Sequence, residues 1–194
     1  MISFIANAKV KRSIFVTDPK GEIYHTTSKM LHDKGYKVLT IDFRHPELSN
    51  HINILEPIIC EYENYIKYDK LVNETDNSEL KLDYQNKSIS SYAETNRLIT
   101  SLASMITYDK TQGKDPFWNN SAKNLLEGLI GFFLEEYKDG KIKREQITMT
   151  SIRKFQNSTM EDKNAKKFKF YIEQKPYGSK SKDSLIPILS SSEN

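Results

Sequence analysis

Residues 13–22 read Ser13-Ile14-Phe15-Val16-Thr17-Asp18-Pro19-Lys20-Gly21-Glu22, an apolar run that ends in an acid and is followed by a polar turn. A second apolar run, Val38-Leu39-Thr40-Ile41-Asp42, also ends in an acid. Continuous apolar runs of this length predict buried strands of a parallel sheet. The helical pattern between them completes a strand, helix, strand unit. Its polar residues lie at the carboxyl ends of the strands, where open parallel sheets bind their ligands.

The predicted helix between these strands has recognisable ends. Glu22 lies near its start, where an acid suits the helix dipole, and Gly35 is placed to end it. Residues 43–58 are typical of a loop, and no strand is predicted from residue 59 onward. We therefore predict an α/β segment, residues 1–58, followed by an all-α segment, residues 59–194.

The strongest helical pattern of the chain spans residues 116–138. Asp115 is a natural N-cap and Pro116 fits the first helical position. Gly128 and Gly131 weaken a helix, so we expect them to permit close packing against another helix. Residues 73–87 are polar and acidic and predict a loop. Weaker helical patterns cover residues 59–72, 89–107, 145–156 and 159–174.

Charge is distributed unevenly along the chain. Its net charge is +3, but residues 141–182 alone carry 12 Lys and Arg against 4 Asp and Glu. Such a segment fits a contact with nucleic acid or with an acidic protein surface. A solvated lysine-rich helix face explains it as well, and the absence of an interleaved aromatic or glycine-rich motif favours that interpretation.

The residues that common catalytic sites require are missing. A phosphate-binding loop needs glycines followed by Gly-Lys-Ser/Thr, whereas Gly113-Lys114 precedes Asp115 and Gly140-Lys141 precedes Ile142. No apolar run ends in Asp-Glu, the acid pair that would hold Mg²⁺. We therefore predict no catalytic residue, no metal ligand and no bound cofactor in this chain, and we expect that it does not hydrolyse ATP alone.

Several of these residues resemble a known family. Asp18-Pro19-Lys20-Gly21-Glu22 in its strand and helix context, Asn50-His51-Ile52-Asn53-Ile54-Leu55 and Asp115-Pro116-Phe117-Trp118 are similar to segments of the TraG-type coupling proteins of conjugation and type IV secretion. The middle segment departs from the family pattern, because Ile52 replaces an aromatic residue and Ile54 replaces a proline. Members of this family are membrane-anchored, hexameric, ATP-driven DNA translocases.

The resemblance implies an internal fragment of such a protein. Residues 1–58 would be a short parallel β-α-β piece of a RecA-like P-loop ATPase core that lacks its P-loop. Residues 59–194 would be the all-α domain inserted into that core, truncated at its C-terminal end. ATP and Mg²⁺ would belong to the full-length protein, which is anchored in the bacterial cell membrane with this domain on its cytoplasmic face.

The resemblance also assigns roles and partners. Asp18, Lys20 and Glu22 would lie near the nucleotide. The partners would be a relaxase or relaxosome accessory proteins, other subunits of the hexamer and single-stranded DNA. The residues expected to dock the substrate are Lys163, Lys166, Lys167 and Lys169.

Two alternatives remain open at this point. The chain could be a self-standing nucleotide-binding enzyme with a non-standard phosphate loop, or a plain helical protein-interaction module. ATP binding by the isolated chain would indicate the first alternative. The second predicts no binding to a relaxase.

Overall fold

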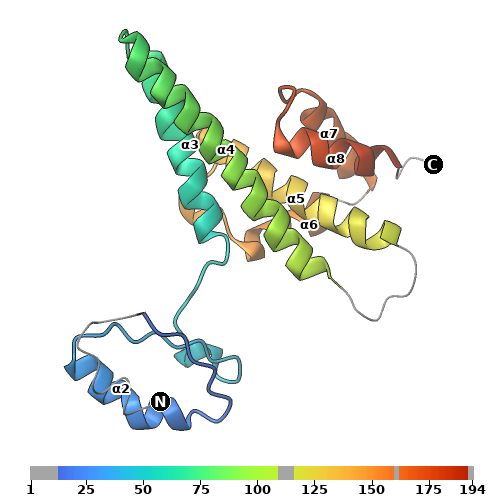
Figure 1. Ribbon diagram of the computed structural model, residues 1–194. Coiled ribbons are helices and arrows are strands. Elements are labelled where there is room, and N and C mark those ends of the chain that lie inside the picture. The colour runs from blue at the N-terminus through green and yellow to red at the C-terminus, as the bar shows by residue number, and fades with distance from the viewer. Residues whose placement is uncertain (1–12, 109–115, 160–161, 192–194) are drawn as a thin grey trace. The chain divides into compact units, whose positions relative to one another are not determined.

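The computed structural model describes residues 13–108, 116–159 and 162–191, without the side chains of residues 116–118, 162–164 and 191 (Figure 1). The chain forms two compact units, Met1–Ile52 and Asn53–Asn194. The predicted functional domains, residues 1–58 and 59–194, place their boundary slightly later, and that assignment stays a prediction.

The predicted β-α-β unit is wrong, because none of the described residues lies in a β-strand. The described chain is all-α, and it contains no RecA-like P-loop core. Both apolar runs face solvent instead: Phe15 is 91% exposed, Leu39 56% and Ile41 52%. Parallel strands need neighbouring strands and layers that cover both faces, and two strands alone are marginal. The described part of this unit contains neither further strands nor layers that would cover the two runs.

Helix α2 (Glu22–Asp33) is the longest helix in the described part of the first unit, and it lies where the pattern predicted it. Gly35 follows it with a φ of 74°. Its N–H donates to the His32 carbonyl at 2.8 Å, and the Tyr36 N–H donates to the Leu31 carbonyl at 3.0 Å. These bonds satisfy carbonyls at the helix end in a conformation that glycine adopts readily, which confirms the role predicted for Gly35. The short 3₁₀ helix η1 comprises Pro46–Leu48.

Helices α3 (Glu56–Glu74) and α4 (Ser78–Thr107) form a long antiparallel hairpin (Figure 1). The loop predicted over residues 73–87 is wrong, because α4 begins near the start of that range. Asn77 caps α4: its side-chain oxygen accepts from the backbone N–H groups two and three residues further on, at 3.0 and 3.1 Å. Such a cap satisfies donors that have no partner inside the helix.

Helices α5 (Pro116–Lys138) and α8 (Lys180–Ser191) pack against each other through the glycines of α5. A Cβ atom on Gly128 would lie 2.7 Å from Cδ2 of the buried Leu185. One on Gly131 would lie 2.9 Å from Cβ of the first residue of α8. The predicted role of these glycines in close helix packing is therefore confirmed.

An aromatic cluster joins α5 to the helices that follow it. The remaining elements are η2 (Arg144–Gln146), α6 (Met149–Thr159) and α7 (Asp162–Glu173). The ring centroids of Phe132 and Phe155 lie 5.1 Å apart, and Phe168 lies 5.2 Å from each of them. Phe168 is 6% exposed, so this cluster fixes which face of α7 points inward.

Candidate docking surface

The three residues predicted to lie near a nucleotide surround the start of α2, not the end of a strand. A carboxylate oxygen of Asp18 accepts the backbone N–H of Tyr24 at 2.9 Å, and this bond supports the first turn of the helix. Lys20 and Glu22 face solvent. The structure thus brings Asp18, Lys20 and Glu22 together locally, and their nucleotide-proximal role stays a prediction.

The lysines predicted to dock a substrate lie on α7, where they differ in exposure. Phe168 and Ile172 turn the other face of the helix into the core, at 6% and 0% exposed. Lys166 and Lys167 are exposed, whereas Lys169 is only partly exposed and has interactions within the chain. The side chain of Lys163 lies outside the described residues. Lys166 and Lys167 are therefore the best placed of the three described lysines to meet a partner.

An aromatic side chain shares the solvent face of α7 with these two lysines. Phe170 is 65% exposed. It follows Lys167 by three residues and Lys166 by four. Side chains at this spacing are neighbours on a helix surface. Phenylalanine is among the residues that are enriched in protein interfaces. We define Lys166, Lys167 and Phe170 as the α7 face.

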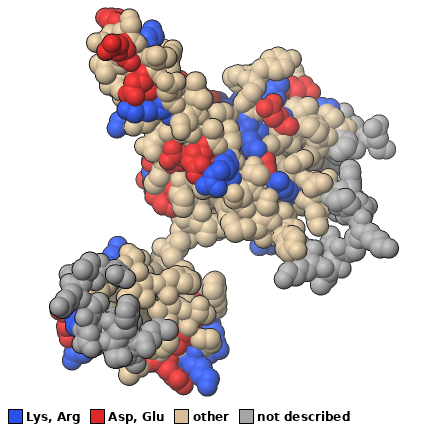
Figure 2. All heavy atoms as spheres, viewed as in Figure 1, with Lys and Arg blue, Asp and Glu red and all other residues tan. Residues whose placement is uncertain are grey.

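Much of the basic character of residues 141–182 is used inside the fold. Lys141 pairs with Asp139 at 3.0 Å, and Lys180 pairs with the buried Glu127 at 2.5 Å. Lys182 donates to the backbone carbonyl of Glu173 at 2.8 Å. On the face shown in Figure 2, acidic and basic side chains are accordingly intermixed over the helical unit. The excess positive charge of this segment does not make one continuous basic surface there.

Arg144 forms another of these internal contacts. Its guanidinium lies 2.6 Å from a carboxylate oxygen of Glu56 and 2.9 Å from one of Glu63, both on α3. The hydrogen bonds to Glu56 and then to Glu63 raise the pKa of Arg144, and the bond to Arg144 lowers the pKa of Glu56. Arg144 thereby ties the turn after α5 to the first half of the hairpin.

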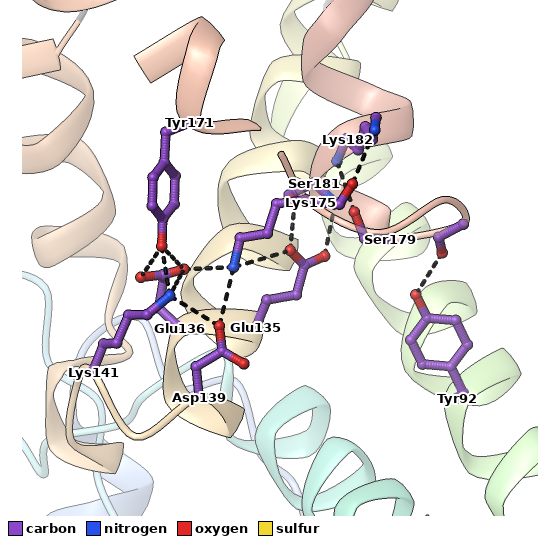
Figure 3. A network of polar contacts seen from close by, with 11 residues as sticks. Tyr92, Glu135, Glu136, Asp139, Lys141, Tyr171, Lys175, Ser179, Ser181 and Lys182 are labelled. Carbon is purple, nitrogen blue, oxygen red and sulfur yellow. Dashed lines mark hydrogen bonds and ion pairs between the residues drawn. The ribbon is translucent and has the colours of Figure 1, made fainter. Parts of the chain in front are cut away.

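A polar network built around Glu136 holds the C-terminal end of α7 against α5 (Figure 3). The carboxylate of Glu136 accepts from the Tyr171 hydroxyl at 2.8 Å and from Lys175 Nζ at 2.6 Å. Lys141 Nζ lies 3.3 Å from the same carboxylate and donates to the Tyr171 hydroxyl at 2.6 Å. Burial alone would lower the pKa of Lys175, but its hydrogen bond to Glu136 and the nearby charges of Glu136 and Asp139 together outweigh that effect, and the pKa is raised. Because a buried charge needs such partners, the network fixes α7 relative to α5.

The neighbouring Glu135 stabilises the start of α8 (Figure 3). One of its carboxylate oxygens accepts the backbone N–H of Ser181 at 3.1 Å, and the other accepts from the Ser181 hydroxyl. An acid is favourable at a helix N-terminus. Burial raises the pKa of Glu135, although the hydrogen bonds from Ser181 act in the opposite direction. α7 and α8 are thus both anchored on the last turns of α5.

Sequence reasoning missed the buried acids of α5, although a signal for them exists. Glu127 and Glu136 are 5% and 7% exposed. Glu136 follows Phe132 and Phe133 by four and three residues, so it lies within the apolar stripe of α5. An acid in such a position must be paired when the helix packs. Its partners Tyr171 and Lys175 lie more than 30 residues later in the chain.

One protein-family model matches a range of residues that includes most of both units. The family model for conjugative DNA transfer of the type IV secretory system matches residues 4–184. The chain belongs to this family. The resemblance to TraG-type coupling proteins is therefore confirmed, and the chain takes part in type IV secretory conjugative DNA transfer. No curated protein and no solved structure matches it significantly.

This member of the conjugative DNA transfer family shows no membrane span in its described part. Across residues 13–108, 116–159 and 162–191, no helix combines the length and the apolar character needed to cross a bilayer.

Proposed function

We propose that this chain is a substrate-docking part of a conjugative coupling protein. It receives a relaxase or a relaxosome accessory protein, and the full-length protein then transfers the attached DNA. In this proposal ATP and Mg²⁺ act in the full-length protein, a hexamer anchored in the bacterial cell membrane, and this chain lies on the cytoplasmic side. Family membership supports the process, and the α7 face carries the docking role.

The α7 face is the observation on which this role rests. Lys166 and Lys167 are exposed, and neither has an ion-pair or hydrogen-bond partner for its ammonium group among the described residues. Phe170 adds an exposed apolar ring. The Glu136 network and the Phe168 contacts hold the helix that carries them. A fixed helix with two available cations and one apolar anchor suits an acidic protein surface with an apolar recess.

A protein partner fits this face better than DNA alone. Two lysines can neutralise about two phosphates, which gives a salt dependence of only about −1.4 in log K against log salt for a single strand. Proteins that bind DNA tightly make about 6–10 phosphate contacts. The α7 face is therefore too small to hold DNA by charge, whereas a protein contact gains from the ring as well.

Binding of the purified relaxase of the same conjugative system tests this proposal. We expect Lys166→Glu combined with Lys167→Glu to weaken binding at least about tenfold, because the reversed charges repel an acidic surface. Lys29→Glu combined with Lys81→Glu changes the same number of exposed charges on other helices and should bind like the unmodified chain.

Each outcome has a clear meaning. If both double variants lost the same amount of binding affinity, the change in net charge alone would explain the loss. That result would contradict a docking role for the α7 face. Phe170→Ala should also weaken binding without changing its salt dependence, since it removes apolar contact only. Tight binding of single-stranded DNA, abolished by the α7 variant, would favour a nucleic-acid site instead.

A further inference from the structure

His51 and Ile52 lie between two firmly held segments of the chain. Both are exposed, Ile52 at 53%. Neither forms a hydrogen bond or an ion pair with any residue that the structure describes. The boundary between the two compact units falls directly after Ile52. The residues on either side of this pair, by contrast, are bound within their own units.

Asn50 is held within the first unit. Its backbone N–H donates to the Thr40 carbonyl at 2.8 Å, and its side-chain oxygen accepts the Thr40 N–H at 2.8 Å. The hydroxyl of Ser49 accepts the Asp42 N–H at 2.9 Å and donates to the Thr40 carbonyl at 3.3 Å. These bonds fix the chain against residues 40–42 as far as Asn50.

Asn53 is held within the second unit by both ends of its side-chain amide. Its Nδ2 donates to the Ile147 carbonyl at 2.8 Å, and its Oδ1 accepts the Leu55 N–H at 3.1 Å. Its backbone carbonyl accepts the Glu56 N–H at 3.0 Å. An Asn side chain that bonds the backbone two residues further on fixes a turn. Because Leu55 is 0% exposed, the chain is anchored from Asn53 onward.

We propose that His51 and Ile52 form a joint about which the second unit turns as one body on the nanosecond timescale. Asn50 and Asn53 delimit this joint. Each of the two residues contributes two soft backbone dihedrals, and neither is a proline, which would fix one of them. Segments with few buried contacts and few hydrogen bonds move at the lowest cost. The α7 face can thus change its direction while the packing of its helices stays the same.

The joint does not depend on the docking role of the α7 face, so the two proposals can fail separately. The test is backbone amide NMR relaxation of the full isotope-labelled chain, which reports motion on this timescale. We expect low heteronuclear NOE values at His51 and Ile52 and high values at Asn50 and Asn53. We also expect α2 to give a different rotational correlation time from α3 and α4. Uniformly high NOE values from Asn50 to Asn53, or one correlation time for both units, would overturn the proposal.

Variants of Asn53 test whether its side chain sets the end of the joint. Asn53→Ala frees the Ile147 carbonyl and the Leu55 N–H, so we expect low NOE values to extend to Ile54 and Leu55. Asn53→Asp keeps an acceptor for the Leu55 N–H and should extend the mobile stretch less. Asn64→Ala, at an exposed position of α3, should leave the NOE values unchanged. Unchanged values in Asn53→Ala, or a uniform decrease throughout the second unit, would contradict the assigned role of Asn53.

Discussion

The ammonium group of Lys175 lies 2.6 Å from a carboxylate oxygen of Glu136, and each side chain is only 9% exposed. The two residues are far apart in the chain, one in the last turns of α5 and the other just beyond α7. Both are too buried to rely on water for solvation. The pair therefore connects α7 to α5, and the position of the α7 face depends on it.

Replacement of Lys175 by Met should destabilise the protein strongly. Breaking a buried pair costs about 3 kcal/mol, and Glu136 would keep, among the described residues, only the more distant and more exposed Lys141 at 3.3 Å as a cationic partner. Urea unfolding followed by circular dichroism measures the change. The double variant Lys175→Met and Glu136→Leu removes both charges and should recover a large part of the loss. A Lys175→Met protein as stable as the original would show that the pair does not hold α7.

Replacement of Glu135 by Gln should change how stability depends on pH. Because burial raises the pKa of Glu135 above its ordinary value of 4.5, the folded state binds the proton more tightly than the unfolded chain. Its contribution to the free energy of unfolding therefore falls as pH rises from about 4.5 through the folded pKa. Gln keeps an acceptor for Ser181 but does not titrate.

The measurement is urea unfolding of both proteins across this pH range. Glu135→Gln should gain stability relative to the original chain as pH rises above 4.5. The exposed Glu145→Gln is the control and should show no such trend. A constant difference between Glu135→Gln and the original chain, or a difference of the opposite sign, contradicts the assigned environment of Glu135.

Replacement of Gly128 by Ala should lower the thermal stability. Alanine is favoured over glycine in a helix by about 1 kcal/mol, but its Cβ would lie 2.7 Å from Cδ2 of the fully buried Leu185. Overpacking of this kind costs about 1–3 kcal/mol, so the clash outweighs the helix preference. Asn120→Ala, at an exposed position of the same helix, should be neutral or slightly stabilising. A higher melting temperature for Gly128→Ala would mean that α5 and α8 are not closely packed.

The elements that the sequence predicts well are those that carry their own local signals. The apolar stripe and Pro116 predicted α5 as residues 116–138, as observed, and Gly128 and Gly131 predicted its close packing. No helix was predicted over α8, and Pro187 inside it argues against one. The contacts of α5 with Leu185 outweigh that local preference.

Long-range contacts account for the other errors. The apolar runs that contain Phe15 and Ile41 have the composition of strands, but composition does not tell whether neighbouring strands exist to pair with them. Likewise, nothing local links Glu136 to Lys175, because ion pairs between distant segments form only once the helices are packed. The docking role came from the family resemblance and the lysines from the basic segment of residues 141–182, and the structure distinguishes the exposed Lys166 and Lys167 from the less exposed Lys169.

Site-specific photo-crosslinking tests the docking role most directly. A photoreactive amino acid would replace Lys167 on the α7 face in the full-length coupling protein during conjugation, with Lys81 on the hairpin as the matched position. The proposal predicts a crosslink from residue 167 to a relaxase or an accessory protein, and none from residue 81. No crosslink from residue 167 to either partner, or equal crosslinking from both positions, would contradict it.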